Sequence, residues 1–468
     1  MSRDVALMSA TELLRHYRRG TLSPVEATEA ALGQVRKHNE RLNALCWLDE
    51  EGALAQARES EARWRGGRPM GLLDGVPSTV KDLLLTRGWP TLRGSRTVKR
   101  DQAWSEDAPT VARMREHGAV LIGKTTTPEF GWKGVTDSPL TGITRNPWNP
   151  DRTPGGSSGG AAVAAATGMG ALHLGTDGGG SIRIPAAFTG IFGFKQTFGR
   201  VPAYPLSPFG TVAHVGPMTR TVEDAALMLN VITEPDDRDV YALPYDRRDW
   251  RIGLDDGIRK LRIAYSPTLG GNRVEPDVAI LVAGAITRLA EIGAEVEQAE
   301  PDLSGVEDVF RVHWFAGAAN AISAIPADQR TLMDPGLQEV AAAGSKFSLA
   351  EYQRAVKARE ALGQTIAQFH RKYDLLATPT LPMPAFQAGF ETPANAGKGG
   401  RWTDWTPFSY PFNLTRQPAA TIPCGVTKDG LPVGLQLVGR LYDDATVLRA
   451  ARAYESLQPI RMPPSVVG

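Results

Sequence analysis

Several features that mark other classes of protein are scarce in this chain. Its 468 residues include only two cysteines, Cys46 and Cys424, too few for a disulfide framework or a cysteine metal cluster, so we expect a reducing compartment. The 52 basic and 51 acidic residues give a net charge of +1, which offers no electrostatic basis for binding nucleic acid. No apolar run approaches the roughly 18 residues of a membrane span.

Targeting signals and repeats are also missing from the sequence. The N-terminus, Met1-Ser2-Arg3-Asp4, has no apolar segment of a secretory signal behind it, so we expect a cytoplasmic location. Hydrophobic residues make up 42% and charged residues 22% of the chain, which is ordinary for a soluble globular protein. We therefore expect neither nucleic acid nor a membrane as a partner.

Helix and strand signals alternate along the chain. The capping boxes Ser9-x-x-Glu12 and Ser23-Pro24-x-Glu26 predict helices over about Ala10–Arg18 and Pro24–Asn39. Strands separated by helices favour an α/β fold with a large mixed, mostly parallel β-sheet covered by helices on both faces. Further helices are predicted at about Glu50–Arg65, Ala108–His117, Val222–Ile232, Pro276–Ile292 and Ala445–Leu457. Strands are predicted to end at Lys81 and to lie at about Ala119–Gly123, Leu172–Gly175, Ile263–Tyr265, Leu375–Ala377, Ala420–Pro423 and Gly434–Val438.

Two glycine-dense loops that carry serine are the most informative part of the sequence. The first, Gly155–Gly160, contains Ser157, and the second, Gly178–Ser181, ends in Ser181; an alanine-rich segment lies between them. Glycine lets a backbone turn sharply and approach a ligand closely. A serine beside several unobstructed N–H groups has what an oxyanion hole needs. The candidate oxyanion donors are the backbone N–H groups of Gly178, Gly179, Gly180 and Ser181.

This pattern resembles the signature of the amidase signature family of serine hydrolases. A segment ending in Lys81, Gly75-Val76-Pro77-Ser78-Thr79-Val80-Lys81, lies upstream, and the run from Gly190 to Arg200 continues the pattern downstream. The resemblance covers about 65–455 and is strongest over 71–202. It implies a Ser–cis-Ser–Lys triad that cleaves amides. The triad positions are Lys81 as the base, Ser157 as the middle serine after a cis peptide bond, and Ser181 as the nucleophile.

The chemistry of these residue types agrees with the triad. A serine hydroxyl is a weak nucleophile that needs a neighbouring base. Lysine serves as a base only where its ammonium is desolvated or repelled. Apolar residues surround Lys81 in the sequence, so we expect it to be buried with a lowered pKa. Asp82 should face the opposite side of the strand, and Ser157 should relay the proton between Lys81 and Ser181.

Three more residues are predicted to support the triad. Asp177 and Arg183 flank Ser181, and we expect an ion pair between them that holds its loop. Ser158 is the third. It also formally fits the nucleophile-elbow motif G-x-S-x-G, but the preceding residues 146–154 contain three prolines and cannot form the strand that an elbow requires.

Rival motifs for the chemistry are weaker. Lys124 and Lys195 are alternative lysines, for which we expect structural roles. The sequence contains no phosphate-binding loop, no H-E-x-x-H motif and no two cysteines at the spacing of zinc ligands. We therefore predict no cofactor and no metal site.

Substrate selection is expected in the region 303–345 and in an aromatic run. The run consists of Trp402, Trp405, Phe408, Tyr410 and Phe412. It either forms a pocket wall suited to an apolar or aromatic group or packs in the core, and the sequence leaves both open. Gly178 stands where many members of the family carry a larger residue, which should widen the oxyanion loop.

Two functions stay open at this point. The first is a hydrolase of small neutral, aryl or apolar amides, with carbamates (urethanes) and esters as further substrates, acting through an acyl-enzyme. The alternative is the A-type glutaminase subunit of a tRNA-dependent amidotransferase, which the aromatic-rich stretch 402–417 disfavours. The expected partner is a small-molecule amide or carbamate, and a homodimer stays open. We expect a single amidase signature domain over 1–468, with a helical segment at about 1–65, a signature core at about 66–235 and a variable substrate-side region at about 260–415.

Overall fold

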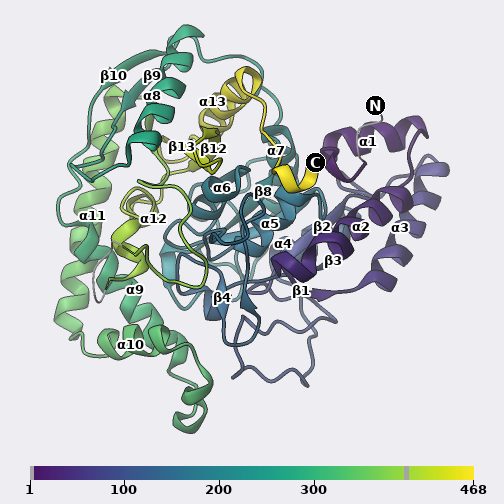
Figure 1. Ribbon diagram of the computed structural model, residues 1–468, viewed down its shortest axis with the longest axis horizontal. Coiled ribbons are helices and arrows are strands. Elements are labelled where there is room, and N and C mark those ends of the chain that lie inside the picture. The colour runs from purple at the N-terminus through teal and green to yellow at the C-terminus, as the bar shows by residue number, and fades with distance from the viewer. Residues whose placement is uncertain (1–4, 395–399, 468) are drawn as a thin grey trace.

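A large β-sheet forms the centre of the computed structural model, which describes residues 5–394 and 400–467 (Figure 1). Its strands are β1 (Leu45–Leu48), β2 (Pro77–Lys81), β3 (Val120–Thr125), β6 (Leu172–Asp177), β7 (Phe192–Lys195), β8 (His214–Thr219), β9 (Arg262–Tyr265), β10 (Glu295–Gln298), β11 (Leu375–Pro379), β12 (Ala419–Val426) and β13 (Pro432–Gly439). These 11 strands follow the order β1-β3-β2-β6-β8-β7-β12-β13-β11-β9-β10. Strands β4 (Asp137–Ser138) and β5 (Gly142–Ile143) form a separate pair.

The sheet is mixed, as predicted, but its parallel strands are fewer than predicted. Parallel pairing joins β3-β2-β6 on one side and β11-β9-β10 on the other. The strands between these two blocks pair antiparallel, as does the edge strand β1. The physical reason is connectivity, because a short turn joins β12 to β13 and a short connection allows only antiparallel pairing. Strands β7 and β8, which were not predicted from the sequence, take part in three of these antiparallel pairs, β6-β8, β8-β7 and β7-β12.

Helices cover both faces of the sheet, as predicted. On β13, Leu435 and Leu437 pack into the hydrophobic cluster that contains residues of α7, α8 and α13, whereas Val438 packs into the cluster that contains residues of α6. Neighbouring strand residues point to opposite faces, so these clusters lie on opposite sides of the sheet. The helices are α1 (Ala10–Arg19), α2 (Pro24–Leu42), α3 (Glu50–Arg65), α4 (Pro109–Glu116), α5 (Gly159–Thr167), α6 (Arg183–Thr189), α7 (Val222–Ile232), α8 (Pro276–Glu291), α9 (Val306–Ile322), α10 (Pro335–Gly344), α11 (Leu349–Lys372), α12 (Pro411–Leu414), α13 (Asp444–Leu457) and α14 (Pro464–Val467).

The first helices begin where the capping signals predict. Ser9 and Ser23 each accept a hydrogen bond from the backbone N–H three residues later, and Glu12 and Glu26 complete the two capping boxes. Helix α1 ends at Gly20, which adopts the left-handed conformation that glycine tolerates. Both capping boxes are local, but α1 also receives a cap from a distant residue, because the carboxylate of Asp224 accepts the N–H groups of Ala10 (2.9 Å) and Thr11 (3.0 Å).

The alanine-rich segment between the two serine loops forms helix α5, and all of its residues are buried. Small side chains let this helix pack closely against its neighbours. A Cβ atom on Gly160 would lie 2.5 Å from the backbone nitrogen of Thr126, so glycine is required there. The helix therefore sets the first loop at a fixed depth inside the molecule.

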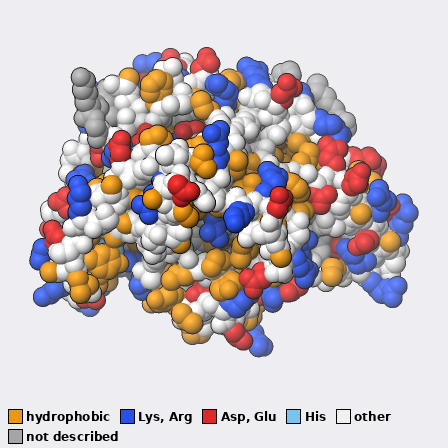
Figure 2. All heavy atoms as spheres, turned by 90° about the horizontal axis from the view of Figure 1, so that it is seen from below, with side chains coloured by type: hydrophobic (Ala, Val, Ile, Leu, Met, Phe, Trp, Pro, Cys, Tyr) orange, Lys and Arg blue, Asp and Glu red, His pale blue; other side chains and the backbone are white. Residues whose placement is uncertain are grey.

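The surface shows no large region of one charge on the face seen in Figure 2, where acidic and basic side chains are interspersed. Within residues 5–394 and 400–467, no helix combines the length and the apolar character needed to cross a bilayer.

Candidate active site

Lys81 ends strand β2 in the interior of the sheet and is fully buried. Its Nζ atom lies within hydrogen-bond distance of three hydroxyl groups, those of Ser157 (2.7 Å), Ser158 (2.8 Å) and Thr176 (2.8 Å). Burial lowers the pKa of Lys81 well below its ordinary value, against the opposing charge of Asp177. A lysine with a lowered pKa can be neutral near physiological pH, so it can accept a proton.

Asp82 points away from Lys81, as expected for the next residue along a strand. Its carboxylate lies 3.1 Å from Lys124 Nζ and accepts backbone N–H bonds from Leu92 and Gly94. The rival lysine Lys124 is thus held in a buried ion pair, and Asp82 is committed to it.

The two serine loops meet at one pocket. Ser157 follows a cis peptide bond from Gly156, as the resemblance implies, and Ser157, Ser181 and Thr176 all line the pocket. The Ser158 N–H donates to the Ser181 carbonyl at 3.2 Å. No described residue hydrogen-bonds to the Ser181 hydroxyl, and such bonds often tighten only when substrate binds.

Asp177 and Arg183 form the predicted ion pair, and both are fully buried. The Nε and Nη2 atoms of Arg183 each lie 3.0 Å from a carboxylate oxygen of Asp177. Burial alone would raise the pKa of Asp177, but the guanidinium of Arg183 holds it below its usual range. The carboxylate also accepts the N–H groups of Gly180 (2.8 Å) and Ile182 (3.2 Å). The pair therefore holds both sides of Ser181.

One predicted oxyanion donor needs correction. The N–H of Gly180 is engaged by Asp177, so it does not point to where an oxyanion would form. The N–H groups of Gly178, Gly179 and Ser181 donate to no described residue. The glycine at 180 is required for another reason, since its φ of +127° is open to few other residues. The N–H groups of Gly178, Gly179 and Ser181 therefore remain as candidate oxyanion donors. The sequence alone could not show that the N–H of Gly180 is already hydrogen-bonded.

The expectation of a widened loop at Gly178 is wrong. A Cβ atom at this position would lie 2.9 Å from Cζ3 of Trp314, so the indole ring fills the space that a side chain would take. Trp314 stacks on Phe209 with ring centroids 3.9 Å apart, and its Nε1 donates to the carbonyl of Trp132 at 2.9 Å. The glycine allows a fixed aromatic ring to pack against the loop.

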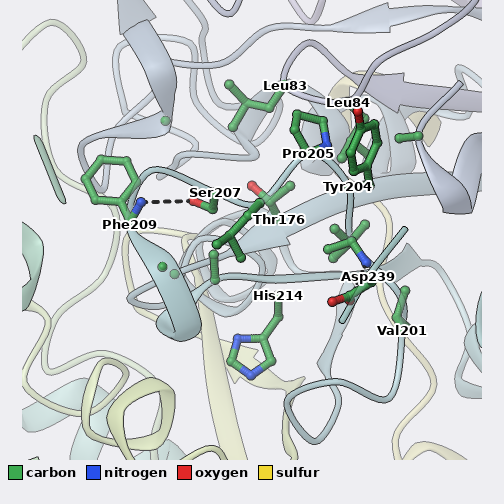
Figure 3. Close-up of a pocket in the computed structure, with 18 of the residues that line it drawn as sticks. Leu83, Leu84, Thr176, Val201, Tyr204, Pro205, Ser207, Phe209, His214 and Asp239 are labelled. Atoms are coloured by element: carbon green, nitrogen blue, oxygen red, sulfur yellow. Dashed lines mark hydrogen bonds between the residues drawn. The ribbon is translucent and has the colours of Figure 1, made fainter. Parts of the chain in front are cut away.

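Apolar side chains form most of the pocket wall (Figure 3). Leu83 and Leu84 follow the strand that carries Lys81, and in the view of Figure 3 they lie on the same side as Tyr204 and Pro205. A second group comes from the segment between β7 and β8, with Val201, Tyr204, Pro205 and Phe209. This segment was not predicted from the sequence, although its proline and aromatic content was a usable signal. Polar groups at the pocket include Thr176, Ser207, His214 and Asp239.

The aromatic run lies in the core. Its members Trp402, Trp405, Phe408, Tyr410 and Phe412 are at most 2% exposed and belong to one hydrophobic cluster. None of these five side chains lines the pocket. Trp402 contacts the oxyanion loop instead of the pocket, because a Cβ atom on Gly179 would lie 2.6 Å from its Cη2. Of the region 303–345, Trp314 reaches the pocket.

Comparison with known proteins agrees with this geometry. The family described as Amidase matches residues 26–448. An acylamidase of Rhodococcus erythropolis is 36% identical over 97% of this chain and 96% of its own length. A glutamyl-tRNA(Gln) amidotransferase subunit of Myxococcus xanthus, of the A type, is also 36% identical, over 96% of both chains. A solved bacterial aryl acylamidase of the amidase signature family superposes with a TM-score of 0.90, at 29% identity over 97% of this chain and 96% of that one. This chain therefore belongs to the amidase signature family and is an amidase.

Proposed function

We propose that this chain hydrolyses the C–N bond of small apolar or aryl amides as a stand-alone enzyme, through an acyl-enzyme on Ser181. The observation that carries the proposal is the 2.7 Å contact between Lys81 Nζ and Ser157 Oγ in a pocket that Ser181 also lines. A desolvated lysine, a relay hydroxyl and a nucleophilic hydroxyl are what acyl transfer requires.

The first half of the reaction forms the acyl-enzyme. Ser181 Oγ attacks the carbonyl carbon while its proton passes to Ser157, and the proton of Ser157 passes to neutral Lys81. The oxyanion accepts hydrogen bonds from the N–H groups of Gly178, Gly179 and Ser181. When the tetrahedral intermediate collapses, the C–N bond breaks, and the proton on Lys81 returns through Ser157 to the leaving nitrogen.

The second half releases the acid. Water attacks the acyl ester and gives its proton to Lys81 by the same relay, and Ser181 recovers its hydrogen as the C–O bond breaks. The same steps serve a carbamate, because an alkoxy group on the carbonyl changes neither the attack nor the oxyanion. Carbamates and esters are therefore part of the proposal.

The apolar wall supports the substrate class. Burial of apolar surface is worth about 25 cal/mol per Å², so a phenyl-bearing amide should bind better than acetamide. The relevant wall comes from Leu83, Leu84, the segment 201–209 and Trp314, and not from the aromatic run after residue 400. The likeness to an acylamidase and to an aryl acylamidase points the same way.

A glutaminase component of an amidotransferase is the second candidate, because a protein of that kind is equally similar in sequence. Specificity constants of the purified single chain for a nitroanilide, an aryl carbamate, acetamide and glutamine separate the two. We expect the nitroanilide and the carbamate to rank above acetamide and glutamine. If glutamine ranks first, or if activity appears only with added partner subunits, the amidotransferase function replaces the proposal.

A further inference from the structure

Arg93 lines the active-site pocket, and its charge has no partner there. The side chain is half-buried, yet its guanidinium forms no hydrogen bond or ion pair with any residue in 5–394 or 400–467. Burial lowers the pKa of Arg93 from its ordinary value, against the opposing charge of Asp82. A partly desolvated cation without a partner is costly, and such a group in a native structure calls for an explanation.

The backbone at Arg93 is held in place on both sides. Its φ is +57°, a left-handed conformation that costs energy for any residue other than glycine. The carboxylate of Asp82 accepts the N–H groups of Leu92 (3.2 Å) and Gly94 (3.3 Å), one residue before and one after Arg93. Because Asp82 directly follows Lys81, these bonds fix Arg93 relative to the catalytic base.

A chain of contacts places Arg93 near the proton relay. Its carbonyl accepts the N–H of Phe130 at 2.8 Å, and Phe130 also lines the pocket. The next residue is Gly131, where a Cβ atom would lie 3.3 Å from Ser157 Oγ. In the proposed reaction Ser157 returns the proton to the leaving nitrogen, so this side of the pocket should receive the amine part of the substrate.

The other titratable groups around the pocket do not neutralise Arg93. The carboxylate of Asp239 accepts two backbone N–H groups, and Asp82 is paired with a buried lysine. Burial lowers the pKa of both Lys81 and His214, which favours their neutral forms. The guanidinium of Arg93 is therefore available to donate hydrogen bonds to an acceptor on a bound molecule.

We propose that Arg93 binds an oxygen acceptor on the amine part of the substrate, most strongly when that acceptor is a carboxylate. This inference rests on the proposed function and narrows it to amides whose leaving amine carries such a group, a departure from a strictly neutral substrate. A guanidinium donates two parallel hydrogen bonds to a carboxylate, and an apolar wall strengthens this interaction.

The test uses three substrates that differ only at the para position of the leaving aniline. They are 4-acetamidobenzoate, its methyl ester and 4-methylacetanilide, with released amine measured by chromatography. Comparing each variant with the wild-type enzyme cancels the intrinsic reactivity of the leaving groups. Arg93→Met should lower kcat/KM for the carboxylate about 10- to 100-fold more than for the methyl compound, with the ester between them. Arg93→Lys should keep part of the preference.

The matched control is Arg96→Met, which removes the same charge from an exposed position three residues away and should leave the three ratios unchanged. A direct binding measurement keeps the test independent of turnover. By calorimetry, the wild-type protein should bind 4-aminobenzoate more tightly than 4-methylaniline, and Arg93→Met should abolish the difference.

Two results would overturn the inference. One is an equal loss on all three substrates in Arg93→Met, which would mean that Arg93 acts on the fold or on Lys81. The other is equal binding of the two anilines by the wild-type protein. Inactivity of the wild-type protein on every amide, with the binding difference intact, would instead reject the proposed function alone.

Discussion

Lys81 can act as a base only because its surroundings remove it from water. The side chain is fully buried, and the three hydroxyl groups around its Nζ atom hydrogen-bond to it without adding negative charge. Arginine at the same position would stay protonated. The chemistry of the site at the scale of residues is therefore the chemistry of one desolvated amine and the hydroxyls that it contacts.

Replacement of the nucleophile should nearly abolish turnover. Ser181→Ala removes the attacking oxygen and should lower the rate by at least about three orders of magnitude. Steady-state kinetics on a nitroanilide measure the loss. A sulfonyl fluoride should add to the protein at Ser181, as peptide mass mapping will show. Near-full activity in Ser181→Ala would reject the assignment, whereas Ser345→Ala, at an exposed position, should be silent.

The pH profile tests the role of Lys81. Only the neutral amine accepts a proton, so kcat/KM should rise as pH rises through the pKa of Lys81 and then level off. Because burial lowers that pKa well below 10.5, the rise should lie well below the range of an ordinary lysine. Lys81→Arg should be almost inactive at every pH. Wild-type kinetics in Lys81→Arg would contradict the relay, and the exposed Lys346→Arg serves as the control.

At the scale of elements, the oxyanion loop after β6 depends on a helix from a distant part of the chain. Helix α9 supplies Phe310 and Trp314, whose rings pack where side chains on Gly179 and Gly178 would lie. Helix α5 sets the other serine loop from within the core. The two loops therefore meet because two helices pack against them, and a substitution in either helix should change the rate of the reaction.

Substitution of Gly178 tests this coupling. In Gly178→Ala the new methyl group meets the ring of Trp314, so the loop must shift, and we expect kcat to fall about 10-fold or more, as when an oxyanion donor is misplaced. Trp314→Phe shortens the ring and should restore part of the loss in the double variant. Strict additivity of the two single effects would contradict the coupling. Gly33→Ala, with open space around its Cβ atom, is the matched control.

At the scale of the whole molecule, the Asp177–Arg183 pair joins parts of the chain that are far apart in the sequence. Arg183 donates to the Ser409 carbonyl (2.8 Å), to Gln436 on β13 (2.8 Å) and to Asn413 in α12 (2.6 Å). One buried guanidinium thus connects the loop of the nucleophile with the C-terminal strands. Loss of its counter-charge should affect the entire fold.

Asp177→Asn should lower the free energy of unfolding by about 3–5 kcal/mol, because it leaves a buried guanidinium without its carboxylate. Urea denaturation measures the change. The pKa of Asp177 lies below its usual range, so the contribution of the pair is present above about pH 4 and disappears as pH falls toward the folded pKa. Glu307→Gln, which breaks an exposed pair with Arg311, should cost less than about 1 kcal/mol. Equal effects of the two substitutions would contradict the argument.

Features that depend on a few neighbouring residues could be predicted from the sequence alone. Ser9 and Ser23 predicted two helix starts, because a capping box is complete within four residues. Alternation of apolar runs predicted most strands of the sheet and its helical layers. The spacing of Lys81, Ser157 and Ser181, read through a family resemblance, brought together three residues that the fold places around one pocket.

The groups that face that pocket were decided by tertiary contacts. Contacts between distant segments decide strand direction and the packing of the ring of Trp314 over Gly178. They also decide that the N–H of Gly180 is bound by Asp177 and that the Trp402–Phe412 run is buried. An aromatic residue has the same apolar character in a core and in a pocket wall, so composition cannot separate the two. Packing makes that choice, because it depends on which surfaces meet when the elements come together.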